Sequence, residues 1–236
     1  MGGMTTQQTI GIPQQDGRRT AAAARRRLRE KEILAATRAL FDERGVRDAQ
    51  IEDIARAVGI NRAIIYRHFT GKEELFALAL VGYLDELAAR LQDADDTSAT
   101  PAERLRTITG AFVDYGLEFP AFVDCALTIM RRPGRELLDE ISEGAMYRLG
   151  RGISVSLAVV VRIIRAGVAD GSFHTTDEDL LANTLYASGL GGLQLARVGV
   201  LVRQAGPGMP VTAKLSAQQV KEHLVASSVA MAVGAA

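Results

Sequence analysis

Residues 51–69 constrain the fold more than any other part of the sequence. A short amphipathic segment with Ile51 and Ile54 on one side ends at Gly59, and a second follows with Ile65 and Phe69 one turn apart. A chain that reverses sharply between two helices needs a residue for which left-handed backbone is cheap, and glycine is that residue. Two short helices joined in this way are typical of a helix-turn-helix motif.

The outward side of the second segment carries residues that suit a DNA major groove, which accepts one helix. Arg62 can donate two parallel hydrogen bonds to a guanine edge, Ala63 permits close approach, and Ile64 offers a methyl surface to thymine. The remaining polar side chains can donate to phosphate oxygens and so fix orientation without reading sequence; they are Tyr66, Arg67, His68 and Lys72. In the alternative interpretation Tyr66 and His68 pack against the first helix, and Arg62 is only solvated.

Charge is distributed unevenly along a chain whose formal net charge is zero. Residues 1–72 carry 14 basic and 8 acidic side chains, whereas residues 73–236 carry 14 and 20. This asymmetry predicts a polyanionic partner for the first third alone. Arginines 18, 19, 25, 26, 27 and 29 precede the motif and allow two interpretations: a flexible arm that reaches a minor groove, or a solvated extension of the first helix.

Helical spacing dominates the rest of the chain, and no alternating run is long enough to predict a strand. The fold class is therefore all-α, with nine to ten helices. We expect a disordered tail at 1–20, a three-helix DNA-binding domain at 21–71, and a larger effector-binding and dimerisation domain at 72–236 that begins with a connecting helix at 72–92. Beyond a polar linker at 93–101, helices are expected at 101–118, 120–131, 135–169 with a break near Gly150, 177–203 and 216–232, with a loop at 204–210.

The N-terminal region carries a longer pattern from Arg29 to Leu80. Its parts are Glu32-Ile-Leu-Ala-Ala-Thr37, Leu40-Phe41 with Gly45, Asp53-Ile-Ala55 with Gly59, Asn61-Arg-Ala-Ile-Ile-Tyr66, His68-Phe69 and Lys72-Glu-Glu-Leu-Phe76. This pattern resembles the N-terminal signature of the tetracycline-repressor-like (TetR) family. The resemblance implies a dimeric, ligand-responsive repressor in which Arg62, Ala63 and Ile64 meet bases and Tyr66, His68 and Lys72 meet phosphates.

Two positions depart from the family pattern. Where the family usually has Ser or Thr capping the second helix, this chain has Asp48-Ala49-Gln50, so we expect Asp48 to cap one turn early. Arg67 follows Tyr66, where the family often has an aromatic residue. A phosphate contact by Arg67 would add salt dependence to DNA binding, because each neutralised phosphate releases counterions.

The region 101–203 supplies candidates for an effector cavity between helices. The candidate lining residues are Phe112, Tyr115, Phe119, Phe122, Met130 and Tyr147, with Asn183 as a polar group. An apolar or amphipathic small molecule fits them best, although rings at helical spacing also make an ordinary core. The small-residue run from Ala187 to Gly192 predicts close approach of another helix, either in a four-helix bundle across a homodimer axis or, alternatively, in a kink or a contact within one chain.

The sequence lacks the motifs that are typical of other functional classes. One cysteine and three separated histidines argue against a metal site, and no phosphate-binding glycine loop, dinucleotide fingerprint or nucleophile elbow is present, so we predict no enzyme and no cofactor. The apolar stretch 153–168 is interrupted by two arginines and no secretory signal is evident, which indicates a cytoplasmic protein with no membrane partner. The remaining alternatives are a transcriptional activator of the same fold and an architectural DNA binder without an effector.

Overall fold

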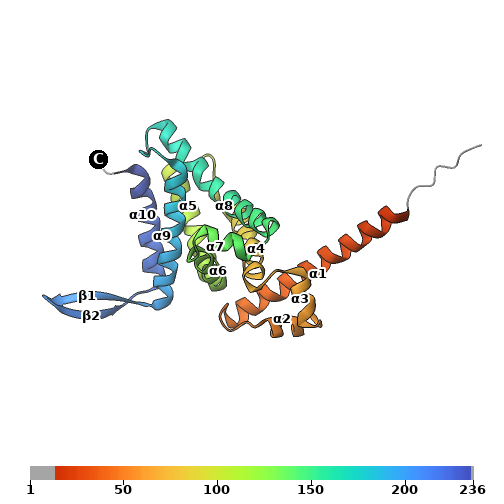
Figure 1. Ribbon diagram of the computed structural model, residues 1–236. Helices are drawn as coiled ribbons and strands as arrows, with labels where there is room; N and C mark the ends of the chain where they lie inside the picture. The colour runs from red at the N-terminus through yellow and green to blue at the C-terminus, as the bar shows by residue number, and fades with distance from the viewer. Residues whose placement is uncertain (1–13, 235–236) are drawn as a thin grey trace, which may run out of the picture.

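Three helices form the N-terminal third of the chain, and seven helices with one hairpin form the rest of the described residues (Figure 1). The computed structural model describes the backbone of residues 14–234 and the side chains of residues 19–133 and 135–234. The elements in chain order are α1 (Gln14–Arg44), α2 (Ile51–Val58), α3 (Arg62–His68), α4 (Lys72–Ala94), α5 (Pro101–Glu118), α6 (Pro120–Met130), α7 (Gly134–Glu140), α8 (Glu143–Asp170), α9 (Glu178–Val198), β1 (Val200–Gly206), β2 (Met209–Lys214) and α10 (Ala217–Val233).

The turn between α2 and α3 has the predicted geometry. Gly59 takes a left-handed conformation with φ of 70°, and the side chain of Asn61 accepts a hydrogen bond from the Ala63 amide at 2.9 Å, which caps α3. The expected cap of α2 was wrong: the residue at its start is Gln50, whose side chain makes no capping hydrogen bond, and Asp48 does not replace it.

The long helix α1 begins at Gln14, so residues 14–20 are helical where the sequence analysis expected a disordered tail. Residues 1–13 of that tail lie outside the described part of the chain. Alanines and arginines after Thr20 favour helix and propagate it from the buried half around Ile33. The arginine-rich stretch is therefore an extension of α1 rather than a flexible arm, and it projects from the rest of the molecule (Figure 1).

One hydrophobic core runs from the N-terminal helices into the rest of the molecule through α4. Ile65 and Phe69 of α3 are buried as predicted, and the ring of Phe41 meets that of Phe76 edge to face, with centroids 4.9 Å apart. Helix α4 then packs against α8, α5 and α6. Helices α5, α6 and α10 begin at the predicted positions within one residue.

The long helix predicted at 135–169 is broken at a different place. Helix α7 ends at Glu140, and α8 restarts at Ser142, whose hydroxyl accepts a hydrogen bond from the Ala145 amide. Gly150 lies inside α8 without a break. The extended backbone of Ile141 ends α7 and the Ser142 N-cap starts α8, whereas a single glycine within a helix costs only about 1 kcal/mol.

Residues 200–214 form an antiparallel β-hairpin that the sequence analysis missed. Helix α9 ends at Val198 instead of 203, because Gly199 adopts a left-handed conformation with φ of 70°. The run Val200-Leu-Val202 pairs with 212–214, and the predicted loop at 204–210 is instead the distal part of the hairpin. β-Branched residues on either side of Gly206-Pro-Gly208 are a hairpin signal.

The small-residue run in α9 makes contacts within the chain, which was the alternative interpretation. A Cβ added at Gly189 would lie 2.5 Å from the Phe112 ring of α5, and one at Gly192 would lie 2.8 Å from Leu224 of α10. Gly191 has open space beside it. Two of the three glycines therefore serve the packing of α9 inside one chain, and the third remains on the surface.

Helix α8 is the one candidate membrane span among the described residues. It has 28 residues, and its most apolar 18-residue stretch has a mean hydropathy of 1.8, although such a span was excluded above on account of two arginines. Core helices meet the same length and composition criterion. In this fold α8 packs against α4, α5 and α9, which accounts for its apolar character.

Candidate nucleic-acid interface and effector cavity

The outward side of α3 is polar and accessible. Burial of Ile65 and Phe69 fixes the rotation of this helix, and Arg62, Ala63, Tyr66 and Arg67 are exposed as a result. Ile64 and His68 are half-buried on the side that faces α1. The predicted DNA-contacting residues of α3 thus share one surface, divided between a fully exposed part and a part beside α1.

Arg62 forms an ion pair with Glu52 of α2. The Nη1 and Oε1 atoms are 2.5 Å apart, and both side chains are about half exposed. The guanidinium also lies 5.8 Å from the centroid of the Tyr66 ring. An exposed pair of this kind contributes at most about 1 kcal/mol, so Arg62 can leave Glu52 for a stronger bidentate partner at small cost.

A hollow of about 350 Å³ separates α1 from α3, and its lining is strongly basic. The lining residues are Arg25, Arg26, Arg29, Ile64, Arg67 and His68. Among the described residues Arg29 pairs with Glu32, while Arg25, Arg26 and Arg67 have no ion pair. This hollow extends the basic surface of α3 onto the extension of α1.

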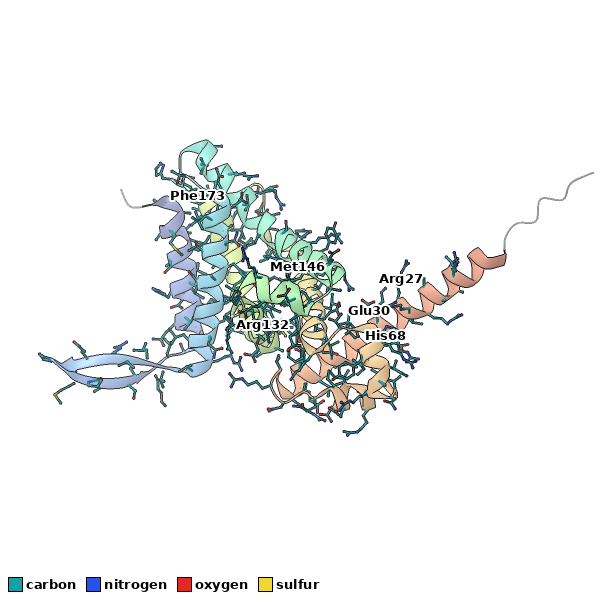
Figure 2. The ribbon with its side chains drawn as sticks, in the orientation of Figure 1. Arg27, Glu30, His68, Arg132, Met146 and Phe173 are labelled. Atoms are coloured by element: carbon teal, nitrogen blue, oxygen red, sulfur yellow. The ribbon has the colours of Figure 1, made fainter. Side chains whose placement is uncertain are left out.

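His68 is one of the residues that line this basic hollow. Its Nδ1 atom is buried and has no hydrogen-bond partner among the described residues. Burial and the positive charge of Arg26 lower the pKa of the imidazole, although Glu30 acts in the opposite direction. Figure 2 places His68 beside the part of α1 that carries Arg27 and Glu30.

Lys72 lies at the start of α4, where the chain leaves the motif. Its side chain is half-buried, and the Nζ atom lies 5.0 Å from the centroid of the Phe76 ring. The lysine therefore has a defined position at the end of the same surface. A cation held in this way can meet a phosphate oxygen without ordering a free side chain.

The second candidate site is a cavity of about 380 Å³ that is lined by five helices and open to the surface at Ser188, His223 and Met231. Its apolar lining is Leu87 and Leu91 from α4, Leu105, Ile108 and Phe112 from α5, Leu157 and Val160 from α8, Ala182, Leu185, Tyr186, Gly189 and Gly192 from α9, and Leu224 and Met231 from α10. The polar lining is Thr109, Ser156, Ser188, His223, Ser227 and Ser228. No Asp, Glu, Lys or Arg is among these lining residues.

Hydroxyl groups gather where α10 meets the cavity. The Thr109 hydroxyl donates to that of Ser228 at 3.1 Å, and the Ser227 hydroxyl lies 3.4 Å from His223 Nε2. Apolar walls with a few hydroxyls and one imidazole suit a neutral or weakly polar molecule. Within the described part of the chain, no group of three or more His, Cys, Asp or Glu residues could hold a metal ion.

The structure brings together few of the residues predicted for this cavity. Phe112 lines it. Tyr115 and Phe122 are instead packed in a ring cluster with Tyr83 and Phe119, and the Phe122 ring also meets that of Phe112 edge to face, with centroids 6.1 Å apart. Met130, Tyr147 and Asn183 are exposed, with Tyr147 at 74% of its full accessibility.

Two helices that line the cavity also hold the DNA-binding helices in place. The buried carboxylate of Glu74 on α4 accepts hydrogen bonds from the Thr70 amide, just after α3, and from the Ser142 hydroxyl at the start of α8. Farther along α8, Arg148 pairs with Glu30 of α1. These contacts join α4 and α8, which line the cavity, to the helices that carry the basic surface.

Sequence reasoning missed Glu52 and Glu74, which face residues that are distant in the sequence. It also missed most of the cavity lining, which comes from small residues. Ser188, Gly189 and Gly192 on α9 oppose Ser227 and Ser228 on α10. Small residues clustered within two apolar helices were the available signal, and the first cluster was interpreted as close approach of another helix, either across a homodimer axis or within one chain.

The fold and the α3 surface define the class of helix-turn-helix transcription regulators. The sequence profile of bacterial regulatory proteins of the tetR family matches residues 33–79. Nucleoid occlusion factor SlmA of Salmonella paratyphi A is 31% identical over 170 residues, which cover 70% of this chain and 80% of SlmA. The chain belongs to the tetR family of bacterial regulatory proteins. Its members are transcription regulators, which confirms that it is not an enzyme.

Another relative is the HTH-type transcriptional repressor KstR2 of Mycobacterium tuberculosis, which is 44% identical over 78 residues. That match spans 33% of this chain and 39% of the repressor. The structure of KstR2, described as a ketosteroid transcriptional regulator, aligns with a TM-score of 0.54 and 26% identity over 85% of this chain and 93% of that one. RolR bound to resorcinol aligns with a TM-score of 0.65, 19% identity and coverage of 89% and 90%, which shows the shared fold alone.

Proposed function

We propose that this protein is a cytoplasmic transcriptional repressor that binds a palindromic DNA operator as a homodimer and is released by a small apolar or amphipathic effector. The observation that carries the proposal is the basic surface shared by α3 and α1, with Arg62, Tyr66 and Arg67 exposed. The similar protein KstR2 is a transcriptional repressor, which supports repression as the sign of regulation.

In the proposed complex α3 lies in the major groove. Arg62 exchanges Glu52 for a guanine edge, while Ala63 and Ile64 approach the neighbouring bases. Tyr66, Arg67, His68 and Lys72 donate to phosphates on either side. Two copies of α3 in successive major grooves, about 34 Å apart, read the two halves of the operator.

Release is proposed to begin at the cavity. An effector there contacts α4 through Leu87 and Leu91 and α8 through Leu157 and Val160. The same helices contact the DNA-binding helices through Glu74 and Arg148. An effector that binds one arrangement of α4 and α8 better than the other changes the spacing of the two α3 helices and lowers operator affinity.

Selection of bound fragments from random duplex DNA tests the DNA-binding part of the proposal. The expected result is a palindromic site bound by a dimer, with affinity that falls as salt rises. Competition by neutral apolar compounds, beginning with steroids and phenols, then tests release. Binding that no compound weakens favours an architectural role, and compounds that increase transcription from the operator favour an activator.

Variants at Arg62 test the proposed base contact. Arg62→Ala should lose about 1–3 kcal/mol on the selected site and little on random duplex. Arg106→Ala, an exposed arginine on α5, is the matched control and should leave both affinities unchanged. An equal loss on both DNAs would assign Arg62 to the phosphate backbone instead.

A further inference from the structure

The β-hairpin of residues 200–214 projects beyond the helices that it connects (Figure 1). Val200, Val202, Met209 and Val211 are exposed on it, with Val202 at 73% of its full accessibility. A two-stranded hairpin alone is marginally stable in water, and exposed valines in a strand gain nothing from solvent. These observations indicate a surface that is covered when the protein functions.

The face of the molecule from which the hairpin extends is poor in charge, with Glu222 of α10 exposed one turn before its apolar residues. Exposed residues of α9 follow one stripe at three- and four-residue spacing: Leu180, Thr184, Ala187, Gly191, Leu195 and Val198. On α10 the exposed residues from Ala226 onwards are Ala226, Ala230, Met231 and Val233. Depletion of charge together with small and apolar side chains is typical of the centre of a protein–protein interface.

We infer that the hairpin is an arm that packs against a second copy of this chain. That second copy binds to the face formed by α9 and α10. This inference rests on the proposed homodimer and adds a specific contact to it. The apolar stripe of α9 continues from Val198 directly into Val200 of β1. Because the hairpin projects on the α9–α10 side and away from α1–α3, a molecule docked on that face lies beside it (Figure 1).

Charge also favours a second copy as the occupant. The segment from Gly199 to Leu215 contains Arg203 and Lys214 and no acidic residue. The face that such an arm would meet exposes Glu222 of α10, and residues 73–236 as a whole are net acidic. Arg203 on β1 and Lys214 on β2 therefore bring positive charge, beside apolar side chains, to a second copy whose residues 73–236 carry a net negative charge.

Excision of the hairpin tests the inference cleanly, because its two ends meet. The Leu215 amide donates to the Gly199 carbonyl at 2.9 Å, so a short Gly-Asn-Gly turn can replace residues 200–214 without moving α9 or α10. Sedimentation velocity over a dilution series gives the dimer dissociation constant of the full chain and of the excised variant. We expect at least a tenfold weaker dimer after excision, with unchanged helical circular dichroism.

The outcomes separate the arm from the homodimer itself. A full chain that stays monomeric at all concentrations overturns both proposals. A full chain that dimerises with a constant within twofold of the excised variant overturns the arm alone. Val202→Glu should weaken the dimer as excision does, whereas Leu138→Glu, an exposed apolar position on α7, is the matched control and should leave it unchanged.

Cross-linking locates the contact directly. A benzophenone attached to Val202→Cys labels the arm selectively, since the native Cys125 is buried. In a mixture of unlabelled and ¹⁵N-labelled chains, we expect cross-linked peptides that pair one isotope with the other. Cross-links confined to peptides of a single isotope would contradict the inference.

Discussion

The two sides of α5 present contrasting interiors. On one side Tyr115 joins Phe119 and Phe122 in a ring cluster, with centroids 4.9 and 5.4 Å from its own ring. On the other side Ile108 and Phe112 face a cavity of about 380 Å³. The same helix therefore borders a filled core and an unfilled one.

The difference arises from the size of the residues that oppose α5. Large rings from α4 and α6 meet the closed side, and the Tyr115 hydroxyl donates to the Tyr83 carbonyl at 2.9 Å. Glycines and serines of α9 and α10 face the open side. A protein that keeps a hollow forgoes apolar burial there, and a bound ligand can restore it.

The largest expected effect comes from truncating a ring on each side. Phe122→Ala should lower the free energy of unfolding by about 3–5 kcal/mol, because the ring is fully buried among others. Phe112→Ala should cost less, about 1–3 kcal/mol, because its ring already lacks partners toward the cavity. Urea denaturation followed by circular dichroism measures the free energy of unfolding of both variants. Equal losses would contradict the difference in packing between the two sides of α5.

Alkaline pH should destabilise the closed side. Burial, with a hydrogen bond to Asp42, raises the pKa of Tyr83, and burial, with the charge of Glu86, raises the pKa of Tyr115. An unfolded tyrosine ionises near pH 10 while the folded one stays protonated, so stability is constant below pH 10 and falls above it, by about 1.4 kcal/mol per pH unit for each tyrosine. The closed side, with two such tyrosines, should contribute more than the open side, where burial raises the pKa of Tyr186.

Unfolding at pH 9–11 measures this slope. Tyr115→Phe should reduce this slope by the contribution of one tyrosine, because Tyr83 and Tyr186 retain theirs, whereas Tyr147→Phe, at an exposed position, should leave it unchanged. If Tyr115→Phe left the pH dependence of the free energy of unfolding unchanged, the Tyr115 hydroxyl would be accessible to water in the folded protein.

Filling the cavity should make the open side resemble the closed one. Ser227→Leu places an apolar side chain into the hollow and should stabilise the fold by about 0.5–2 kcal/mol. It should also weaken binding of an apolar fluorescent probe such as anilinonaphthalene sulfonate at least tenfold. Ser227→Ala, which leaves the hollow open, should bind the probe as the original chain does. Equal probe binding by both variants would place the probe elsewhere.

The smallest expected effect concerns the hydroxyl pair in the cavity wall. Thr109→Val removes the donor to Ser228 while keeping the side-chain shape, and should cost about 0.5–1 kcal/mol in thermal or urea unfolding. A loss above about 2 kcal/mol would indicate that the open side is as tightly packed as the ring cluster. Thr107→Val, on the exposed side of α5, is the control.

The helix-turn-helix could be predicted because its determinants are local. Gly59, Asn61, Ile65 and Phe69 set the turn, the cap and the buried side of α3 within eleven residues. The roles assigned to the outward residues remain predictions. The sequence could not indicate that Arg62 faces Glu52, because that contact depends on how α2 crosses α3.

The cavity could not be predicted from the same kind of pattern. Helical spacing identifies an apolar side but not the helix that it faces, so Tyr115 and Phe122 were as plausible as Phe112. Their large rings pack against each other and leave no space. The hairpin was missed because the run before Gly206 also continues the helical spacing of α9, and Gly199 alone marks the end of that helix.

The continuity of α1 has a mechanical consequence. Its 31 residues form one rod about 45 Å long, with Ile33 in the core and the basic hollow nearer the free end. A tilt of about 5° around the buried half displaces the helix near Gln14 by about 2–3 Å. The extension thus works as a lever: small rotations in the core become displacements comparable to a hydrogen-bond length where arginines reach outward.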